Sequence, residues 1–295
     1  MLLGFDQGQI EVRVMAQASG DENLIRDCMS GDIHSKVGHA MTGWPIDKIK
    51  KDKKTRTLTK NIHFGILFGL SSEGLMEFIK LKDPDSTIDD EEAQRLYNNY
   101  FKAYPKVRTF INKMREFVEE NGYVENMFGF RRPLKDKAEI EGYDVEEFGD
   151  DDQTSTAFWG NQAINTPIQG AAHQLMLMAI AMLHRKKKKY KVLGVPTIEV
   201  HDYMGSKIKL KNLISAFHLF KELLEKEPLN VVREEFPKIK WKIPLVVEGK
   251  VGFRLGDSVE LEEDGKVKQM HEILVDMFFE SFVKETKLDY DLRYA

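Results

Sequence analysis

The chain has 295 residues, 42% of them hydrophobic and 31% charged, and its formal net charge is −4 at pH 7. This length and composition are typical of a globular protein with one or two domains and a sizeable core. No apolar stretch is long enough to span a bilayer, and a single cysteine, Cys28, excludes an internal disulfide and a multi-cysteine metal site. We therefore expect a cytoplasmic protein that does not bind membranes.

Apolar patterning and capping residues predict the elements of the first half in chain order. Residues 2–5 are interpreted as a strand, and residues 9–15 as a further strand before a turn into a helix. The helices that follow are predicted over residues 21–29, 33–42, 54–68 and 89–121, the last of them divided at Pro105.

The second half alternates short strands with helices. A strand and a turn are expected over residues 123–132, and the acidic, poorly periodic residues 135–156 are interpreted as an exposed insertion. The remaining predictions are a buried helix at 162–184, strands at 197–200 and 206–210, a helix at 213–225, a strand at 241–253 and a final helix at 267–287. Strands near both ends of the chain and a mostly helical middle predict an α+β fold, with a sheet platform carrying a helical lobe.

Two apolar runs that are far apart in the chain each end on an aspartate, Asp6 in the first and Asp202 in the second. Mg²⁺ prefers one or two protein carboxylates together with substrate phosphate oxygens. Two such ions stabilise the attacking and leaving oxygens of an in-line displacement, as nucleotidyl transfer requires. Either aspartate alone would more simply belong to a turn or a cap, so the metal interpretation rests on the pair and on the helix described next.

The helix predicted over residues 54–68 carries Arg56, Lys60, Phe64 and Phe68 at four-residue spacing. This spacing places the four side chains along one face, where the cations can contact successive phosphates and the rings can pack on a sugar and a base. The simpler alternative is an amphipathic helix with its aromatic residues inward and its cations outward. Because one face mixes core and solvent types of residue, the functional interpretation is favoured.

Basic residues are concentrated in two stretches, 48–60 and 185–191, and an acidic run lies at 146–152. Local patches rather than the net charge decide contact with phosphates. The first stretch leads into the helix just described, which favours phosphate contact there. For the second stretch, a merely solvated surface is an equal alternative.

Three motifs follow one another along the chain. They are Asp6 with Gln9-Ile10-Glu11 and Arg13, then Arg56, Lys60, Phe64-Gly65 and Phe68-Gly69, and finally Val200-His201-Asp202. Supporting segments are Asp32-Ile33-His34, Tyr123-Val124-Glu125 with Phe128-Gly129 and Arg131-Arg132, and Asn165-Thr166-Pro167-Ile168-Gln169-Gly170-Ala171-Ala172. The three motifs resemble motifs A, B and C of the DNA polymerase I family, the family A DNA polymerases, and all the matches together cover most of residues 1–256.

The resemblance implies an α+β fold with an antiparallel palm sheet and a mostly helical fingers lobe. Its domains are expected as palm at 1–30, fingers at 31–160 with the acidic insertion at about 135–156, palm at 161–261 and a C-terminal helical extension at 262–295. Because few residues precede Asp6, the thumb and exonuclease domains are expected to be absent. A second polypeptide would then supply the thumb and the N-terminal palm, as in a split, phage-like polymerase working in the cytoplasm of a host.

The resemblance also implies catalytic roles. Asp6 and Asp202 would bind two Mg²⁺ ions, for which Mn²⁺ is a possible substitute. Arg56 and Lys60 would hold the triphosphate of the incoming nucleotide. Lys60 is also the candidate proton donor to the pyrophosphate, so the implied catalytic set is Asp6, Asp202 and Lys60.

Four further residues are implied to contact the nucleotide. His34 and Gln9 would face the phosphates, although a lone histidine on a helix is more often structural. Phe64 would stack on the incoming dNTP. Glu11 would lie against the 2′ position of the sugar and exclude ribonucleotides.

The implied contacts with primer-template DNA come from several segments. Phe68 would lie beside the template base. The residues expected to touch the minor groove near the primer terminus are Asn165, Gln169 and His201. Arg131 and Arg132 would contact template phosphates, with an ordinary surface role as an equal alternative.

Two positions depart from the family pattern. Motif C normally continues from His-Asp to Glu, but this chain has Tyr203, which cannot bind a metal as a carboxylate does. The usual tyrosine of motif B is Phe68, a milder change because the ring is kept. The sequence thus predicts template-directed DNA synthesis, in which a dNMP is joined to a primer 3′-hydroxyl and pyrophosphate is released.

Two alternatives stay open at this point. A catalytically weak or inactive DNA-binding or assembly subunit of a replication complex is supported by Tyr203 and the missing thumb. An RNA polymerase of related fold is disfavoured, because the bulk of Glu11 should block a 2′-hydroxyl.

Overall fold

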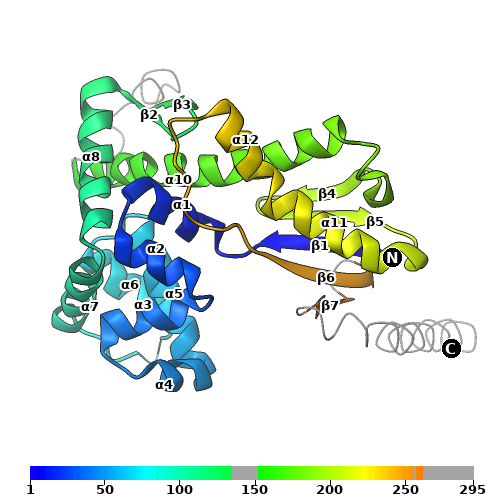
Figure 1. Ribbon diagram of the computed structural model, residues 1–295. Coiled ribbons are helices and arrows are strands. Elements are labelled where there is room, and N and C mark those ends of the chain that lie inside the picture. The colour runs from blue at the N-terminus through cyan, green and yellow to red at the C-terminus, as the bar shows by residue number, and fades with distance from the viewer. Residues whose placement is uncertain (85, 135–151, 255–256, 262–295) are drawn as a thin grey trace, which may run out of the picture. The chain divides into compact units, whose positions relative to one another are not determined.

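The computed structural model describes residues 1–84, 86–134, 152–254 and 257–261. The chain forms two compact units (Figure 1). Unit 1 holds residues 1–8, residues 175–231 and the described residues from 245 onward, and unit 2 holds residues 9–174 and 232–244. No helix among the described residues is long and apolar enough to cross a membrane.

Unit 1 is built on a five-stranded antiparallel sheet with the order β4-β5-β1-β6-β7. The strands are β4 (Pro196–Val200), β5 (Tyr203–Lys207), β1 (Leu2–Gln7), β6 (Val247–Arg254) and β7 (Asp257–Leu261). The N-terminal strand therefore lies in the middle of the sheet, between strands from the second half of the chain. This arrangement confirms the predicted α+β class and the antiparallel sheet.

The core of unit 1 lies between one face of this sheet and two helices, α11 (Leu213–Glu225) and the C-terminal part of α10 (Asp152–Arg185). Leu3 and Phe5 of β1 point into this core, and the Phe5 ring lies 5.2 Å from that of Phe217 and 5.3 Å from that of Phe220. Because side chains alternate along a strand, Gly4 and Asp6 lie on the opposite face. The short 3₁₀ turns η1 (Lys191–Leu193) and η2 (Leu210–Asn212) also pack against α11.

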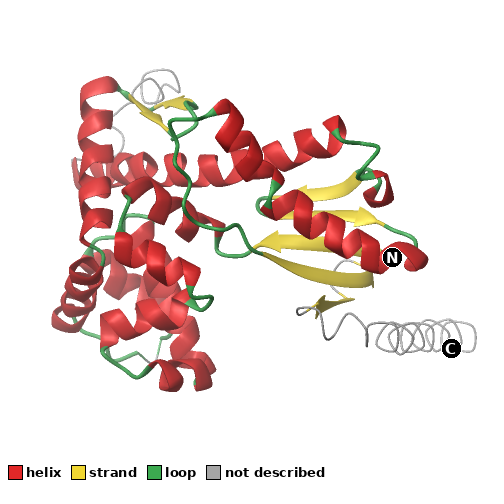
Figure 2. Cartoon of the chain, viewed as in Figure 1, coloured by secondary structure: helices red, strands yellow, loops and turns green. Residues whose placement is uncertain are grey.

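Unit 2 is helical apart from one short hairpin, as Figure 2 shows by colour. Its helices are α1 (Ile10–Ser19), α2 (Glu22–Met29), α3 (Ile33–Thr42), α4 (Ile46–Lys51), α5 (Lys53–Leu67), α6 (Ser72–Lys82), α7 (Asp90–Ala103), α8 (Pro105–Asn121) and the N-terminal part of α10. The hairpin joins β2 (Tyr123–Glu125) and β3 (Arg131–Pro133), and α12 (Glu227–Glu235) begins in unit 1 and ends in unit 2.

Side-chain caps explain where several helices of unit 2 begin. Asp21, Asp32 and Asp52 each accept a hydrogen bond from a backbone N–H in the first turn of the helix that follows. Pro105 is the first residue of α8, where its missing N–H costs no helical hydrogen bond. These local signals are why the predicted helices near residues 21–29, 33–42, 54–68 and 89–121 are confirmed.

The strand predicted over residues 9–15 is wrong, because these residues form the start of α1. Gln9 adopts a φ of 57° and ends the extended chain, and helix begins at Ile10. Val12 and Val14 alternate with polar residues as in a strand, but the run from Val12 to Ala16 is buried. A helix that is covered on most sides leaves no helical periodicity to read.

Other boundaries also differ from the prediction. The strand predicted at 206–210 is β5 and begins at Tyr203, directly after Asp202, and the strand predicted at 241–253 begins only at Val247. The insertion predicted to extend to residue 156 overlaps α10, which begins at Asp152. Helices α4, α6 and α12 were not predicted. Residues 135–151 and the predicted helix at 267–287 lie outside the described residues.

Candidate functional site

The two aspartates of the sequence prediction come together in unit 1. Asp6 is near the end of β1 and pairs in register with Tyr203, the first residue of β5. The backbone N–H of Gln7 donates to the carbonyl of Asp202, with an N···O distance of 2.9 Å. His201, at a φ of 57°, and Asp202 form the tight connection between β4 and β5. The turn thus holds Asp202 beside the end of the central strand.

The carboxyl groups of Asp6 and Asp202 lie close enough together to interact directly. Partial burial, together with the charge of Asp202, raises the pKa of Asp6 to about 6. The ammonium of Lys250 opposes this shift, with its Nζ 3.9 Å from Asp6 Oδ2. Two acidic groups held this close repel each other when both are ionised, and a cation between them removes that cost.

This donor set fits a divalent metal with hard oxygen ligands. The described residues contain no group of three or more His, Cys, Asp or Glu side chains suited to a metal ion. Two carboxylates are nevertheless enough for Mg²⁺, which keeps several water molecules and takes further oxygens from substrate phosphates. Asp6 and Asp202 are the residues that would hold such an ion.

Two residues of β6 that the sequence prediction missed belong to this site. Glu248 lies opposite Asp6 in the sheet register, and Lys250 lies opposite Gly4, so both occupy the face that carries Asp6. The charge of Glu248 contributes to the raised pKa of Asp6. The alternation of the segment around residue 250 was visible in the sequence, but its pairing with β1, which is almost 250 residues away, was not.

The row of residues on α5 faces outward in unit 2. Arg56 and Lys60 are exposed, and Phe64 and Phe68 are half-buried, whereas Thr59 and its neighbours on the opposite side are buried. Lys60 Nζ lies 5.8 Å from the centre of the Phe64 ring, and the Phe64 and Phe68 rings stack with centroids 5.8 Å apart. The outward cations agree with the alternative of an amphipathic helix, but the two aromatic rings are only half-buried rather than fully inward.

Two residues at the start of α3 border this row. Asp32 caps α3 and lies 3.5 Å from Arg56 Nη2, which holds the guanidinium near the helix. His34 is only 4% exposed and its ring centroid lies 5.8 Å from that of Phe64. Burial, reinforced by the charges of Lys60 and Arg56, lowers the pKa of His34 to about 4, so this histidine is neutral at pH 7.

The remaining predicted residues of unit 2 lie on α1 and α10. Gln9 and Glu11 are partly exposed at the start of α1. Asn165 and Gln169 are one turn apart on α10, so they share a face. Gln169 is exposed, and Asn165 Oδ1 is buried without a hydrogen-bond partner among the described residues.

The two arginines of the hairpin differ in their contacts. Arg131 is exposed, forms an ion pair with Glu125 and lies with its guanidinium carbon 4.9 Å from the centre of the Tyr123 ring. Arg132 Nη1 donates to Gln162 Oε1 and Thr166 Oγ1 on α10, each at 3.1 Å. Arg132 therefore ties the hairpin to α10, which supports the structural alternative for this residue more than for Arg131.

The structure thus brings two sets of the predicted residues together. Asp6, Asp202 and His201 lie at one end of the sheet of unit 1. The row of residues on α5, with Asp32 and His34 beside it, is a group within unit 2. Sequence spacing predicted the α5 group because helical neighbours are close in sequence, whereas Asp6 and Asp202 were paired because each ends an apolar run, and the motif resemblance then supported that pairing.

Comparison with known proteins agrees with the family that the sequence motifs resemble. Residues 1–257 match the protein family described as DNA polymerase family A. The chain is 34% identical over 227 residues to the thermostable DNA polymerase I of Thermus aquaticus, which covers 76% of this chain and 24% of that protein. It is 28% identical over 295 residues to the DNA polymerase of Bacillus phage SP01, which covers 99% of this chain and 29% of the phage protein.

A solved structure shares the fold. The polymerase domain of Pol1 from M. smegmatis, in complex with DNA primer-template and dNTP, has a TM-score of 0.66 and 24% sequence identity, covering 84% of this chain and 38% of that chain. The chain spans about a quarter of the length of curated relatives such as the Thermus aquaticus enzyme. Since the family match extends over most of the sequence, the chain belongs to DNA polymerase family A.

Proposed function

We propose that the chain carries the catalytic centre of a template-directed DNA polymerase, which joins a dNMP to a primer 3′-hydroxyl and releases pyrophosphate. The observation that carries the proposal is the close pair of carboxylates, Asp6 and Asp202, on adjoining segments of one sheet. The family match and the names of the relatives support the same activity. The M. smegmatis relative of known structure is bound to primer-template and dNTP, and these are the substrates proposed here.

In this proposal Asp6 and Asp202 hold the metal ions. Bound Mg²⁺, or Mn²⁺ in its place, would activate the 3′-hydroxyl and stabilise the leaving pyrophosphate. The raised pKa of Asp6 means that part of the population must lose a proton before metal can bind near pH 6. Lys250 offsets some of the negative charge of the pair until a metal ion arrives.

The nucleotide would be bound by the row on α5. Arg56 and Lys60 are one turn apart and exposed, as contacts with successive phosphates require, and Lys60 is the proposed proton donor to pyrophosphate. The stacked rings of Phe64 and Phe68 present aromatic surface to the incoming base and the template base.

Four further residues would contact the substrates. Three of them would contact the incoming nucleotide, and the fourth would lie next to the metal-binding aspartates. The neutral imidazole of His34 would donate a hydrogen bond to phosphate rather than supply charge, and Gln9 would assist it. Glu11 would sit against the 2′ position of the sugar. His201 would touch the minor groove next to the metal site, because it immediately precedes Asp202 in the β4–β5 turn.

The remaining DNA contacts would come from α10 and the hairpin. Asn165 and Gln169 would touch the minor groove near the primer terminus. The buried and unpartnered Asn165 Oδ1 supports such a role, because a polar atom of this kind gains from a ligand. Arg131 is the better placed of the two arginines for a template phosphate.

A primer-extension assay tests this proposal. The chain, a labelled primer-template and each dNTP in turn should give incorporation of the complementary nucleotide only, and only with Mg²⁺ or Mn²⁺ present. Tyr203 favours a second candidate, a catalytically weak or inactive DNA-binding subunit. Binding of the primer-template without any incorporation, also in the presence of Mn²⁺, would favour this second candidate.

The predicted second polypeptide stays a prediction. The chain would then work as the C-terminal subunit of a split polymerase, with a partner that supplies the thumb and the N-terminal palm. Primer extension by the chain alone and after addition of candidate partners tests this point. Full processive synthesis by the chain alone would contradict it.

A further inference from the structure

Tyr203 lies in a cradle formed by two glycines of neighbouring strands. Gly4 of β1 and Gly205 of β5 face each other in the sheet register. A Cβ atom on Gly4 would lie only 1.9 Å from the Tyr203 hydroxyl oxygen and 2.3 Å from Cζ, and one on Gly205 would lie 3.1 Å from the same oxygen. The tyrosine ring therefore lies flat across bare backbone, in space that any larger residue at Gly4 would fill.

One face of the Tyr203 ring packs on the backbone of the two glycines, and the side chain is not fully enclosed. Tyr203 is half-buried, and its hydroxyl takes part in none of the hydrogen bonds found among the described residues. On the adjacent strand β4, Val200 lies opposite Tyr203 and is 50% exposed. An aromatic ring with an unused hydroxyl, bordered by exposed apolar surface, is typical of a surface that contacts a ligand.

The position of the ring identifies this ligand. Tyr203 follows Asp202 directly and is the cross-strand neighbour of Asp6, on the sheet face that carries Asp6. In two-metal nucleotidyl transfer the attacking hydroxyl must reach the metal ions, so the sugar that carries it lies next to the metal-binding carboxylates. That sugar belongs to the last nucleotide of the primer.

We propose that Tyr203 is a binding residue for the 3′-terminal nucleotide of the primer, with its ring packed against the sugar and base edge and its hydroxyl as a hydrogen-bond donor. This inference rests on the function proposed above. The proposal explains why a tyrosine occupies the position at which the motif C resemblance leads one to expect a carboxylate. It also explains why the two residues beneath the ring are glycines. The tyrosine adds contact area and a neutral donor where a carboxylate would add negative charge near the DNA.

Binding of DNA in EDTA measures this contact without catalysis. Fluorescence anisotropy should show that Tyr203→Phe binds a recessed primer-template about threefold more weakly than the wild type, since one hydrogen bond is lost. Tyr203→Leu should bind it about tenfold more weakly, since the ring contact is lost as well. Single-stranded template should bind equally to all variants. The control Tyr97→Leu removes a half-buried tyrosine of α7 and should change neither affinity.

Wild-type affinity of Tyr203→Leu for the primer-template would overturn the proposal. So would an equal loss of affinity for single-stranded template, because the contact would then not depend on a primer terminus. Tyr203→Glu, which restores the family carboxylate, should bind the primer-template more weakly than the wild type in EDTA. If it instead binds equally well and incorporates faster, Tyr203 is merely a lost carboxylate and the proposal fails.

A stability cycle tests the cradle without DNA. Gly4→Ala should markedly lower the melting temperature when Tyr203 is present and lower it much less in the Tyr203→Ala background, where the clash is gone. An equal cost in both backgrounds would contradict the geometry on which the proposal stands. Failure of the proposed polymerase function would appear as a lack of nucleotide incorporation by the wild type. Failure of the Tyr203 proposal alone would leave this incorporation intact, so the two failures can be distinguished.

Discussion

Lys250 places a positive charge in the site that is proposed to bind metal cations. Its ammonium lies 3.9 Å from Asp6 Oδ2, and its side chain and that of Asp6 are about one third exposed, so the attraction is screened by solvent. A divalent ion at Asp6 has to compete with this charge. We therefore expect Lys250 to lower the affinity of the proposed site for metal.

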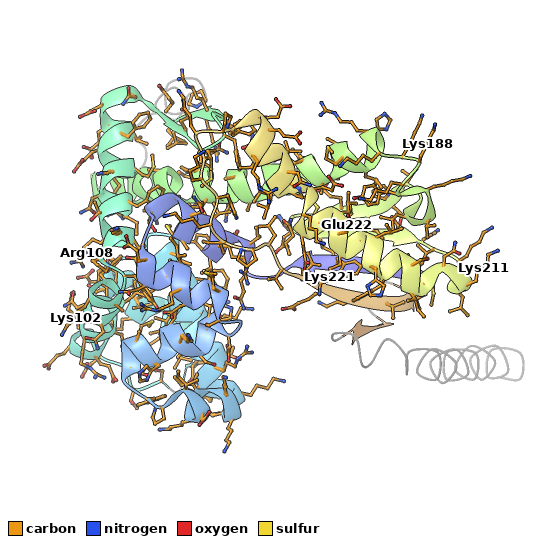
Figure 3. The ribbon with its side chains drawn as sticks, viewed as in Figure 1. Lys102, Arg108, Lys188, Lys211, Lys221 and Glu222 are labelled. Atoms are coloured by element: carbon orange, nitrogen blue, oxygen red, sulfur yellow. The ribbon has the colours of Figure 1, made fainter. Side chains whose placement is uncertain are left out.

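We expect Lys250→Met to bind Mn²⁺ about threefold more tightly than the wild type, because a competing positive charge is removed while the chain length is kept. Electron paramagnetic resonance of free Mn²⁺ in a titration of the protein measures this affinity. Lys211→Met, which changes an exposed lysine at the other end of unit 1 (Figure 3), should bind Mn²⁺ like the wild type. Weaker binding by Lys250→Met would show that Lys250 instead holds the carboxylates in place.

Glu11 is the residue on which sugar selection is predicted to depend. Glu11→Ala should accept rNTPs at least about tenfold better relative to dNTPs, because the steric block at the 2′ position is removed. The ratio of kcat/KM for the two nucleotides measures the change. Unchanged selection would place the discrimination elsewhere, and efficient rNTP use by the wild type would revive the RNA polymerase alternative.

At the scale of elements, local sequence signals were sufficient to predict a helix or a helix face when the residues involved are close together in the sequence. The face of α5 could be predicted because Arg56 and Lys60 are one turn apart, and the caps Asp21, Asp32 and Asp52 mark helix starts. The start of α1 could not, since its buried surroundings removed the helical pattern. Neither could β6 as a partner of β1, because pairing between distant segments is not encoded in either segment alone.

Two buried histidines, His63 of α5 and His34 of α3, make the stability of the protein depend on pH. Burial lowers the pKa of His63 to about 3, and burial with nearby cations lowers that of His34 to about 4. In the unfolded chain both bind a proton near pH 6.5, so acid favours the unfolded state. The unfolding free energy should fall as the pH drops below about 6.5, by up to roughly 1.4 kcal/mol per pH unit for each histidine, and this decline should end near the folded-state pKa values.

Urea unfolding between pH 7 and pH 5 measures this decline. His63→Leu should lose a large part of it, because one of the two buried groups no longer titrates. His218→Gln, which changes an exposed histidine on α11, should keep the wild-type slope. A wild-type slope in His63→Leu would contradict the account.

At the scale of the whole molecule, the second basic stretch proves to be partly structural. Glu227 is 2% exposed and accepts hydrogen bonds from Tyr190 Oη at 2.6 Å and Lys186 Nζ at 2.7 Å. Lys189 lies 3.6 Å from the same carboxylate and 2.8 Å from Glu222. Burial alone would raise the pKa of Glu227, but the hydrogen bonds from Lys186 and Tyr190 outweigh it and hold the pKa below its usual value. These contacts join the segment directly after α10 to the start of α12.

Glu227→Ala should therefore destabilise the protein by about 2–4 kcal/mol, because it leaves the Tyr190 hydroxyl buried without a partner. Glu222→Ala removes the partly exposed acid labelled in Figure 3 and should cost less than about 1 kcal/mol. Chemical denaturation of both variants at pH 7 provides the comparison. Equal, small costs would show that the 185–191 stretch is only a solvated surface.

The division into two units limits what sequence alone could establish for the molecule. The boundaries predicted at residues 30 and 160 differ from those of the compact units, between which the chain passes after residues 8, 174, 231 and 244. The chain leaves the sheet of unit 1 after a few residues and returns to unit 1 much later. The amino-acid composition does not change at these boundaries, so it does not reveal them. The assignment of palm and fingers to these units stays a prediction.

Single-nucleotide incorporation by Asp6→Asn and Asp202→Asn tests the central claim most directly. In the presence of saturating Mg²⁺, each variant should incorporate the complementary dNTP at least about a thousandfold more slowly than the wild type, because several kcal/mol of metal-dependent stabilisation are lost. Asp90→Asn, an exposed acid at the start of α7, should behave like the wild type. Near-normal incorporation by either folded metal-site variant would contradict a metal centre built on these two carboxylates.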